Sequence, residues 1–178
     1  MRFEDLYDEH FEFVWRTLRR LGVPAADLAD VVQEVFLVVH RRLADFEERS
    51  KVTTWLFRIA TNAARGRRRR AHVRREVSAD DVLFAVVDPS SDPSVALELA
   101  DARALLERVL SGLDDEQREV FVAFELEGMS GQAIAMALGI PLGTVYSRLR
   151  LGRERFRQGV ARLRARDSHA RFRMEGVP

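Results

Sequence analysis

Hydrophobic residues recur along most of the chain at the three- and four-residue spacing of amphipathic helices, whereas the alternation typical of strands is nearly absent. The N-terminal half contains three such stripes, of which the first ends at Gly22, the second ends near Leu43 and the third begins at Trp55. Two further stripes run over residues 99–113 and 114–128. The pattern predicts an all-α protein.

A stretch without any usable period divides these predicted helices into two groups. We expect residues 1–72 to form a helical bundle, 73–97 a linker, 98–165 a second small domain and 166–178 a frayed tail. The linker contains two Asp-Pro pairs, which disfavour helix because the residue before proline is pushed out of the α region. We therefore expect two small helical domains on a flexible acidic linker, mobile relative to each other in the free protein. In the competing arrangement, the apolar linker residues at 82–87 seal both domains into one compact unit.

Residues 129–157 have the pattern of a helix-turn-helix whose second helix is basic. Ser130 can cap the first helix, Gly139 suits the tight turn, and Pro141 suits the first turn of the second helix. The second helix is expected to bury four apolar residues, which are Leu142, Val145, Leu149 and Phe156. Such a helix fits the major groove of DNA, although a helical hairpin with a solvated basic face has the same pattern.

Charge is strongly segregated along the chain, although the net charge of its 178 residues is only +1. Residues 65–75 carry seven arginines and no acid, whereas residues 76–101 carry seven acids and no base. Residues 148–166 carry eight arginines and one glutamate. Two basic patches on either side of an acidic connector favour a protein that binds nucleic acid at two places.

The sequence offers no constellation of residues suited to catalysis. It has no cysteine, and its four histidines are scattered without the spacing of metal ligands. It also lacks a phosphate-binding loop. We therefore expect a protein that is not an enzyme and that uses neither a cofactor nor a metal. The absence of a long apolar run and of a signal-peptide core predicts a cytoplasmic protein that does not insert into a membrane.

Four motifs resemble a known family of transcription proteins. Two of them, DVVQEVF at 30–36 and WLFRIATN at 55–62, resemble region two of the extracytoplasmic-function sigma factors. The other two, LDDEQREVF at 113–121 and GTVYSRLR at 143–150, resemble region four of the same family. The resemblance implies an alternative RNA polymerase sigma factor of the sigma-70 family, which directs promoter-specific transcription initiation. Its implied partners are core RNA polymerase, promoter DNA and an anti-sigma factor. The alternatives are a stand-alone helix-turn-helix regulator whose first bundle dimerises or senses a ligand, and an interaction protein that sequesters a polymerase.

The resemblance implies two functional surfaces in the first domain. A polar face with one apolar residue on the second predicted helix is expected to bind core polymerase; its members are Asp30, Gln33, Glu34, Leu37 and Arg41. The third helix and the loop before it are expected to bind the minus-ten promoter element through Lys51, Thr54, Trp55, Arg58, Asn62, Arg65 and Arg69. Arginines and an aromatic ring suit single-stranded DNA, which offers phosphates and stacking surfaces. Trp55 is equally well explained as an anchor in the core.

The second helix of the helix-turn-helix is expected to bind the minus-thirty-five element. The residues concerned are Thr144, Tyr146, Ser147, Arg148, Arg150 and Arg153. Four positions depart from the family pattern, since Ala29, Gly66, Ala133 and Tyr146 stand where the family usually has charged residues. Ala133 leaves the capping box that begins at Ser130 incomplete, which is expected to weaken the start of that helix by ~0.5–1 kcal/mol.

Overall fold

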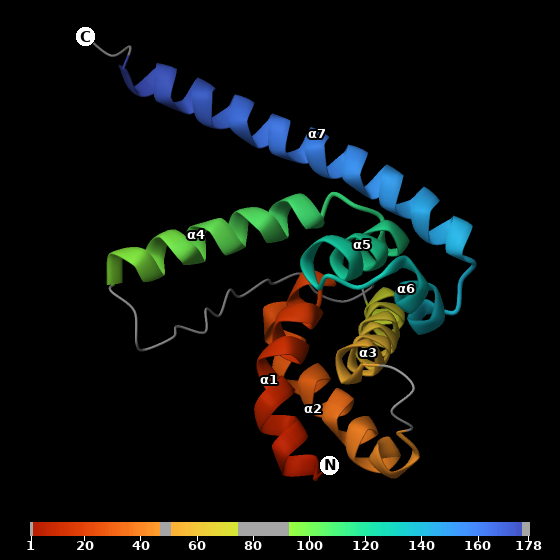
Figure 1. The fold of residues 1–178 in the computed structure, drawn as a ribbon. Coiled ribbons are helices and arrows are strands. Elements are labelled where there is room, and N and C mark those ends of the chain that lie inside the picture. The colour runs from red at the N-terminus through yellow and green to blue at the C-terminus, as the bar shows by residue number, and fades with distance from the viewer. Residues whose placement is uncertain (1, 47–50, 75–92, 176–178) are drawn as a thin grey trace.

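The computed structural model describes residues 2–46, 51–74 and 93–175, and within these ranges the chain forms helices and no strand (Figure 1). The all-α prediction is confirmed. The α-helices are α1 (Phe3–Arg20), α2 (Ala25–Arg42), α3 (Val52–Arg74), α4 (Pro93–Leu110), α5 (Asp115–Phe121), α6 (Gly131–Leu138) and α7 (Leu142–Glu175). A short 3-10 turn, Leu43–Asp45, follows α2, and a π-helical turn, Val122–Leu126, continues α5. None of the described helices combines the length and the apolarity that a membrane crossing needs.

Helices α1, α2 and α3 pack against one another around an apolar core. The predicted stripes form this core, because Leu18 of α1, Val35 of α2 and Leu56 of α3 are all completely buried. The first stripe ends as predicted: α1 ends at Arg20, and Gly22 has a φ of 85°, a left-handed conformation that favours glycine. The periodicity of the sequence was therefore sufficient to predict the three N-terminal helices, although α3 begins at Val52, three residues before the predicted start at Trp55.

The C-terminal helices lie above the N-terminal three in the view of Figure 1, with α7 running along the outside of the molecule. Helix α7 packs against α5, α6 and α4. It continues to Glu175, through most of the segment from residue 166 onward that was predicted to be a frayed tail. The physical reason for the longer helix is that no glycine or proline occurs between Gly159 and Gly176.

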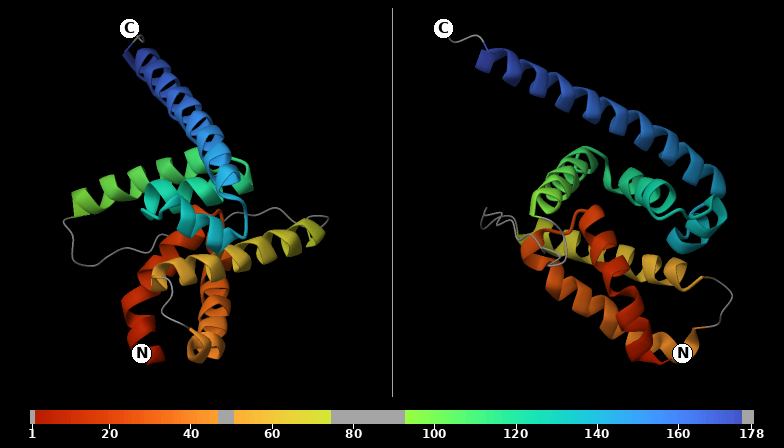
Figure 2. Two further views of the ribbon diagram at one scale, coloured as in Figure 1. Left: turned by 45° about the vertical axis from the view of Figure 1, so that its right-hand side comes forward. Right: turned by 60° about the vertical axis from the view of Figure 1, so that its left-hand side comes forward.

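The linker predicted at 73–97 is shorter in the structure, because α3 extends to Arg74 and α4 already begins at Pro93. The apolar residues at 82–87 lie outside the described residues. The two groups of helices are in contact, with α3 against α6 and α1 against α4, as the two views of Figure 2 show. The two predicted helical domains are thus present, and in this structure they lie in contact with each other. Their mobility in the free protein stays a prediction. The contacts between the two groups are made by the folded helices.

Candidate nucleic-acid interface

The helix-turn-helix predicted at 129–157 is formed by α6 and α7. The hydroxyl oxygen of Ser130 accepts a hydrogen bond from the backbone N–H of Ala133 at 3.2 Å, which is the predicted N-cap. Gly139 ends α6 with a φ of 66°, and its conformation allows the sharp turn into α7. The buried side chains of Ile134, Val145 and Leu149 then fix the two helices against each other.

The cap allows a direct test of how α6 begins. Replacing Ser130 by alanine removes the acceptor, and we expect the free energy of unfolding to fall by about 1 kcal/mol. Because Ala133 has no side-chain group to bond back to Ser130, no second cap compensates for the loss. Urea denaturation followed by circular dichroism measures the change. Ser147→Ala is the matched control, since its hydroxyl bonds to the carbonyl of Thr144 in mid-helix; equal losses in both variants would contradict a specific capping role.

The start of α7 presents several of the predicted minus-thirty-five residues to solvent. Tyr146 is 51% exposed, Ser147 and Arg150 are also exposed, and Thr144 is half-buried. Leu142 was expected to be buried, but it is 39% exposed because the first residue of α7 lies before the helix reaches the core at Val145.

Two of the predicted minus-thirty-five arginines are already paired with carboxylates. Arg148 Nη2 lies 2.6 Å from Glu116 Oε2, and Arg153 Nε lies 2.6 Å from Glu125 Oε1. The guanidinium of Arg153 also lies 5.4 Å from the ring centre of Phe124, within the range of a cation–π contact. Arg150 has no hydrogen bond or ion pair with any other described residue. Arg148 is thus oriented by its neighbour, whereas Arg150 extends freely from the helix.

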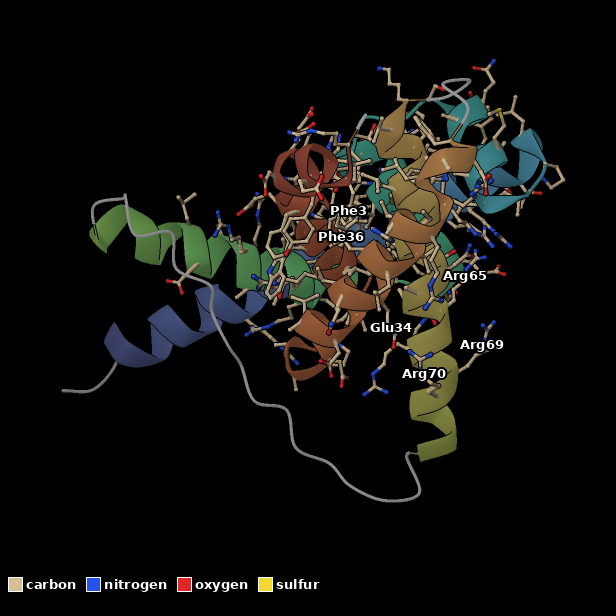
Figure 3. All side chains as sticks on the ribbon, turned by 90° about the horizontal axis from the view of Figure 1, so that it is seen from below. Phe3, Glu34, Phe36, Arg65, Arg69 and Arg70 are labelled. Carbon is tan, nitrogen blue, oxygen red and sulfur yellow. The ribbon has the colours of Figure 1, made fainter. Side chains whose placement is uncertain are left out.

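Helix α3 separates the predicted minus-ten residues into an exposed and a buried set. Arg58, Asn62 and Arg69 are exposed, as is Lys51 before the helix. Figure 3 shows that Arg69 and Arg70 project from different sides of α3, with Arg70 directed toward Glu34 of α2. The exposed residues of α3 can contact a nucleic-acid strand without any change in the helix.

Two of the predicted minus-ten residues lie in the core instead. Thr54 is 7% exposed and Trp55 is 8% exposed, and the ring of Trp55 lies 4.9 Å from that of Phe46 between ring centres. From the sequence, Trp55 suits a surface on which DNA bases stack and a core position equally well. In the structure it is a core anchor. Its position follows from the apolar stripe of α3, since Ile59, one turn further along the helix, is also buried.

Arg65 is turned toward the C-terminal helices, where it forms a bidentate pair with Glu119 of α5. Its Nε and Nη2 atoms donate to the two carboxylate oxygens at 2.9 and 2.5 Å. These hydrogen bonds to Glu119 raise the pKa of Arg65. Arg68, which is not among the predicted minus-ten residues, donates to the same carboxylate at 2.8 Å. Its only signal in the sequence was its place in the arginine run at 67–70.

The expected polymerase-binding face is a continuous exposed strip on α2. All five of its residues, Asp30, Gln33, Glu34, Leu37 and Arg41, are exposed, and the side chain of Leu37 is an exposed apolar group at 50%. The opposite side of α2 is buried in the core. Glu34 pairs with Arg70 of α3 at 2.9 Å, so this strip borders the arginines of α3. The strip is accessible to another protein in the structure described.

An exposed helix-turn-helix together with an arginine-rich helix defines a nucleic-acid-binding protein. Comparison with known protein families identifies the class more narrowly. The family model of sigma-70 region 2 matches residues 6–81, and that of sigma-70 region 4 matches residues 103–156. The chain is 33% identical over 153 residues to the RNA polymerase sigma factor NccH of Alcaligenes xylosoxydans xylosoxydans, covering 83% of this chain and 80% of NccH. It is 34% identical over 140 residues to the ECF RNA polymerase sigma-E factor of Escherichia coli K12, covering 74% of this chain and 73% of that protein.

Two solved structures have a similar fold. CnrH, solved in complex with the cytosolic domain of CnrY, aligns with a TM-score of 0.63 and 29% identity over 92% of this chain and 88% of CnrH. The sigma factor RpoE of Bartonella quintana, solved with the anti-sigma factor NepR, aligns with a TM-score of 0.65 and 23% identity over 89% of this chain and 98% of RpoE. The chain belongs to the extracytoplasmic-function group of the sigma-70 family of RNA polymerase sigma factors. The family resemblance stated from the sequence is confirmed.

Proposed function

We propose that this chain directs promoter-specific initiation by binding core RNA polymerase through α2, the minus-ten element through α3 and the minus-thirty-five element through α7. Residues 1–72 would supply the first two contacts and residues 98–165 the third. The observation that carries the proposal is the exposed strip on α2 in a chain that also carries a helix-turn-helix. A stand-alone regulator could use such a strip to dimerise, but matches to two sigma-70 regions in one chain favour the sigma factor.

The same proposal includes an anti-sigma partner and a chain that performs no catalysis of its own. CnrH was solved with a domain of CnrY and RpoE with an anti-sigma factor, which supports an anti-sigma partner for this chain as well. The proposed role is to position polymerase on DNA in the cytoplasm, with all chemistry performed by the polymerase. Within the described residues, no group of acids and histidines is arranged to hold a metal ion.

Gel filtration tests this assignment against its alternatives. We expect the purified chain to elute as a monomer alone and to co-elute with core polymerase when the two are mixed. Alone, it should bind duplex DNA weakly, because the contacts of a single helix-turn-helix are few. A stable dimer that binds duplex DNA without polymerase would identify a stand-alone regulator. Binding to polymerase without any promoter recognition would identify a sequestering protein.

Arg148 and Arg150 are expected to contribute differently to recognition of the minus-thirty-five element. Arg148 is oriented by Glu116, so Arg148→Ala should cost ~1–3 kcal/mol and relax the preference for particular bases. Arg150 projects freely, so Arg150→Ala should weaken binding to all sequences and reduce the salt slope by about one, as expected for the loss of one phosphate contact. Arg153 is also expected to contact a phosphate, but it must first give up its pair with Glu125, so Arg153→Ala should weaken binding to all sequences less than Arg150→Ala does.

Competition binding of polymerase complexes to promoter variants at several salt concentrations measures both effects. Arg166→Ala, an exposed arginine further along α7, serves as the matched control. Equal and sequence-independent losses at Arg148 and Arg150 would contradict base recognition by Arg148.

A further inference from the structure

The first two turns of α7 carry no charged side chain, although the rest of the helix is rich in arginine. Residues 142–147 have the sequence LGTVYS, and the first charged residue of the helix is Arg148. Within these turns Val145 is buried, whereas Leu142 and Tyr146 are exposed side chains one turn apart. We call Leu142 and Tyr146 the apolar pair. The part of a recognition helix that reaches base edges therefore presents apolar surface and hydroxyl groups in this chain.

Gly131, the first residue of α6, lies against the apolar pair. A methyl group added at Gly131 would lie 2.8 Å from the hydroxyl oxygen of Tyr146 and 3.2 Å from Cδ1 of Leu142. Gly131 is buried and helical, and L-residues adopt helical backbone without strain. The structure therefore depends on the missing side chain of Gly131 rather than on its backbone freedom. The two side chains rest on α6, and this contact limits the movement of the Tyr146 ring.

The major groove offers one group that matches this surface chemically. Guanine is recognised by arginine or lysine, adenine by asparagine or glutamine, and cytosine by a carboxylate, and none of these residue types occurs at 142–147. Hydroxyl groups bond to several bases and distinguish them less sharply. The remaining distinctive group is the C5-methyl of thymine, which is apolar and suits contact with an apolar or aromatic side chain. The start of α7 is thus suited to thymine.

Tyr146 is better placed than Leu142 to reach such a methyl group. Tyr146 is the more exposed of the two and is followed by the exposed Ser147, whereas Leu142 is the very first residue of the helix. A tyrosine ring has only two side-chain torsions to fix, and its contact with Gly131 already restricts them. Little conformational entropy is therefore lost when the ring meets a base, which favours the contact.

We infer that the ring of Tyr146, seated on Gly131, contacts the C5-methyl of a thymine, so that this chain prefers thymine at one position of the minus-thirty-five element. Tyr146 is then a specificity-determining residue, and Gly131 is a positioning residue that acts through it. Tyr146 is also one of the positions at which the chain departs from the family pattern, so the preference is a property of this chain. The inference rests on the proposed function for the placement of α7 on DNA.

Deoxyuridine tests the inference on the DNA side without any change in the protein, because its base lacks only the C5-methyl of thymine. The unchanged chain, bound to core polymerase, would first select duplexes from a pool randomised around position −35. Each thymine of the selected element, on either strand, is then replaced singly by deoxyuridine. At one thymine the replacement should weaken binding about fourfold, the change expected when one methyl group is no longer buried. A selected element without any methyl-dependent thymine would overturn the inference.

Variants of Tyr146 test whether this residue makes the contact. The methyl ratio is the affinity for the thymine duplex divided by the affinity for the deoxyuridine duplex. Tyr146→Phe keeps the ring and should keep the methyl ratio at about four, whereas Tyr146→Ala should reduce it to about one. Met136→Ala removes an exposed apolar side chain of α6 outside the apolar pair, and as the matched control it should leave the methyl ratio unchanged. A methyl ratio kept in Tyr146→Ala would assign the contact to another residue, and one lost in Tyr146→Phe would assign it to the hydroxyl; either result overturns the inference.

Gly131→Ala tests the positioning role without changing Tyr146 itself. The added methyl group meets the hydroxyl end of a flexible side chain, so the ring of Tyr146 is expected to move and α6 to stay in place. The methyl ratio should fall by about twofold or more, because a displaced ring loses contact with the base. Circular dichroism should show unchanged helical content, since alanine favours a helix more than glycine does. Gly66→Ala, the same exchange in α3, places its methyl group 3.7 Å from Nη1 of Arg70 and is the matched control. Equal methyl ratios in both variants would overturn the positioning role of Gly131.

Failure of the inference and failure of the proposed function give different results in this experiment. If the polymerase complex selects no common sequence around position −35, the proposed contact of α7 with that element fails, and the inference fails with it. If the complex selects one sequence but deoxyuridine has no effect at any thymine, the inference alone fails and the proposed function stands.

Discussion

Leu37→Glu is expected to abolish promoter-specific transcription by this sigma factor while leaving its helical content unchanged. Leu37 is the exposed apolar residue of the strip on α2, between Glu34 and Arg41 on the same side of the helix. A charge buried without a partner in a protein interface costs about 2 kcal/mol or more, so Leu37→Glu should weaken core-polymerase binding by about thirtyfold or more. Binding of labelled protein to core polymerase, together with run-off transcription, measures the effect.

Leu99→Glu provides the matched control for this change. Leu99 is 46% exposed on α4, outside the proposed polymerase-binding strip, and the same substitution there should leave polymerase binding unchanged. The circular dichroism spectrum separates the two roles that Leu37 could have. If the helical signal falls together with binding, Leu37 supports the fold and its assignment to the polymerase surface is wrong.

Arg118→Met is expected to cause the largest loss of stability of any single exchange of a charged residue in the C-terminal helices. Arg118 donates hydrogen bonds to the backbone carbonyls of Leu110 at 2.9 Å, Ser111 at 3.3 Å and Leu113 at 3.2 Å, at the end of α4 and in the turn that follows it. It also donates to the carbonyl of Leu21 at the end of α1, at 3.4 Å. Burial lowers the pKa of this guanidinium, in keeping with its position between the helices.

Methionine keeps the bulk of the arginine stem but leaves these carbonyls without their donor. Each buried acceptor that loses its partner costs about 1–3 kcal/mol, and water can replace part of the loss at this half-buried site, so we expect a total of ~2–4 kcal/mol. Urea denaturation measures the free energy of unfolding. Arg108→Met, at an exposed arginine of α4, should change it by less than about 0.5 kcal/mol. Similar values for both variants would show that the hydrogen bonds of Arg118 contribute nothing specific.

The helices and the helix-turn-helix could be predicted from the sequence because their signals are local. Ser130 and Gly139 act within one turn of their own positions, and the apolar stripes of α1, α2 and α3 follow directly from helical periodicity. Two errors also have local causes. Leu142 fits the apolar stripe of α7 but lies one turn before the core, and the end of α7 was placed too early because a charged segment was read as a tail.

The contact between the N-terminal and C-terminal helices could not be predicted, because it joins residues that are far apart in the chain. Glu119 pairs with Arg65 and Arg68, which precede it by 54 and 51 residues, and no sequence pattern selects these partners among the many arginines. Trp55 illustrates a related limit. An aromatic residue on a helix that carries both a core face and a basic face suits either side, and only the packing against Phe46 decides between them.

Reconstituted transcription tests the central claim most directly. Core RNA polymerase would be incubated with sheared genomic DNA and nucleotides, with and without the purified chain, and the 5′ ends of the transcripts would be mapped. We predict discrete start sites that appear only when the chain is present and that share one sequence near position −10 and another near −35. The same pattern of transcripts with and without the chain would contradict its assignment as a promoter-selecting sigma factor.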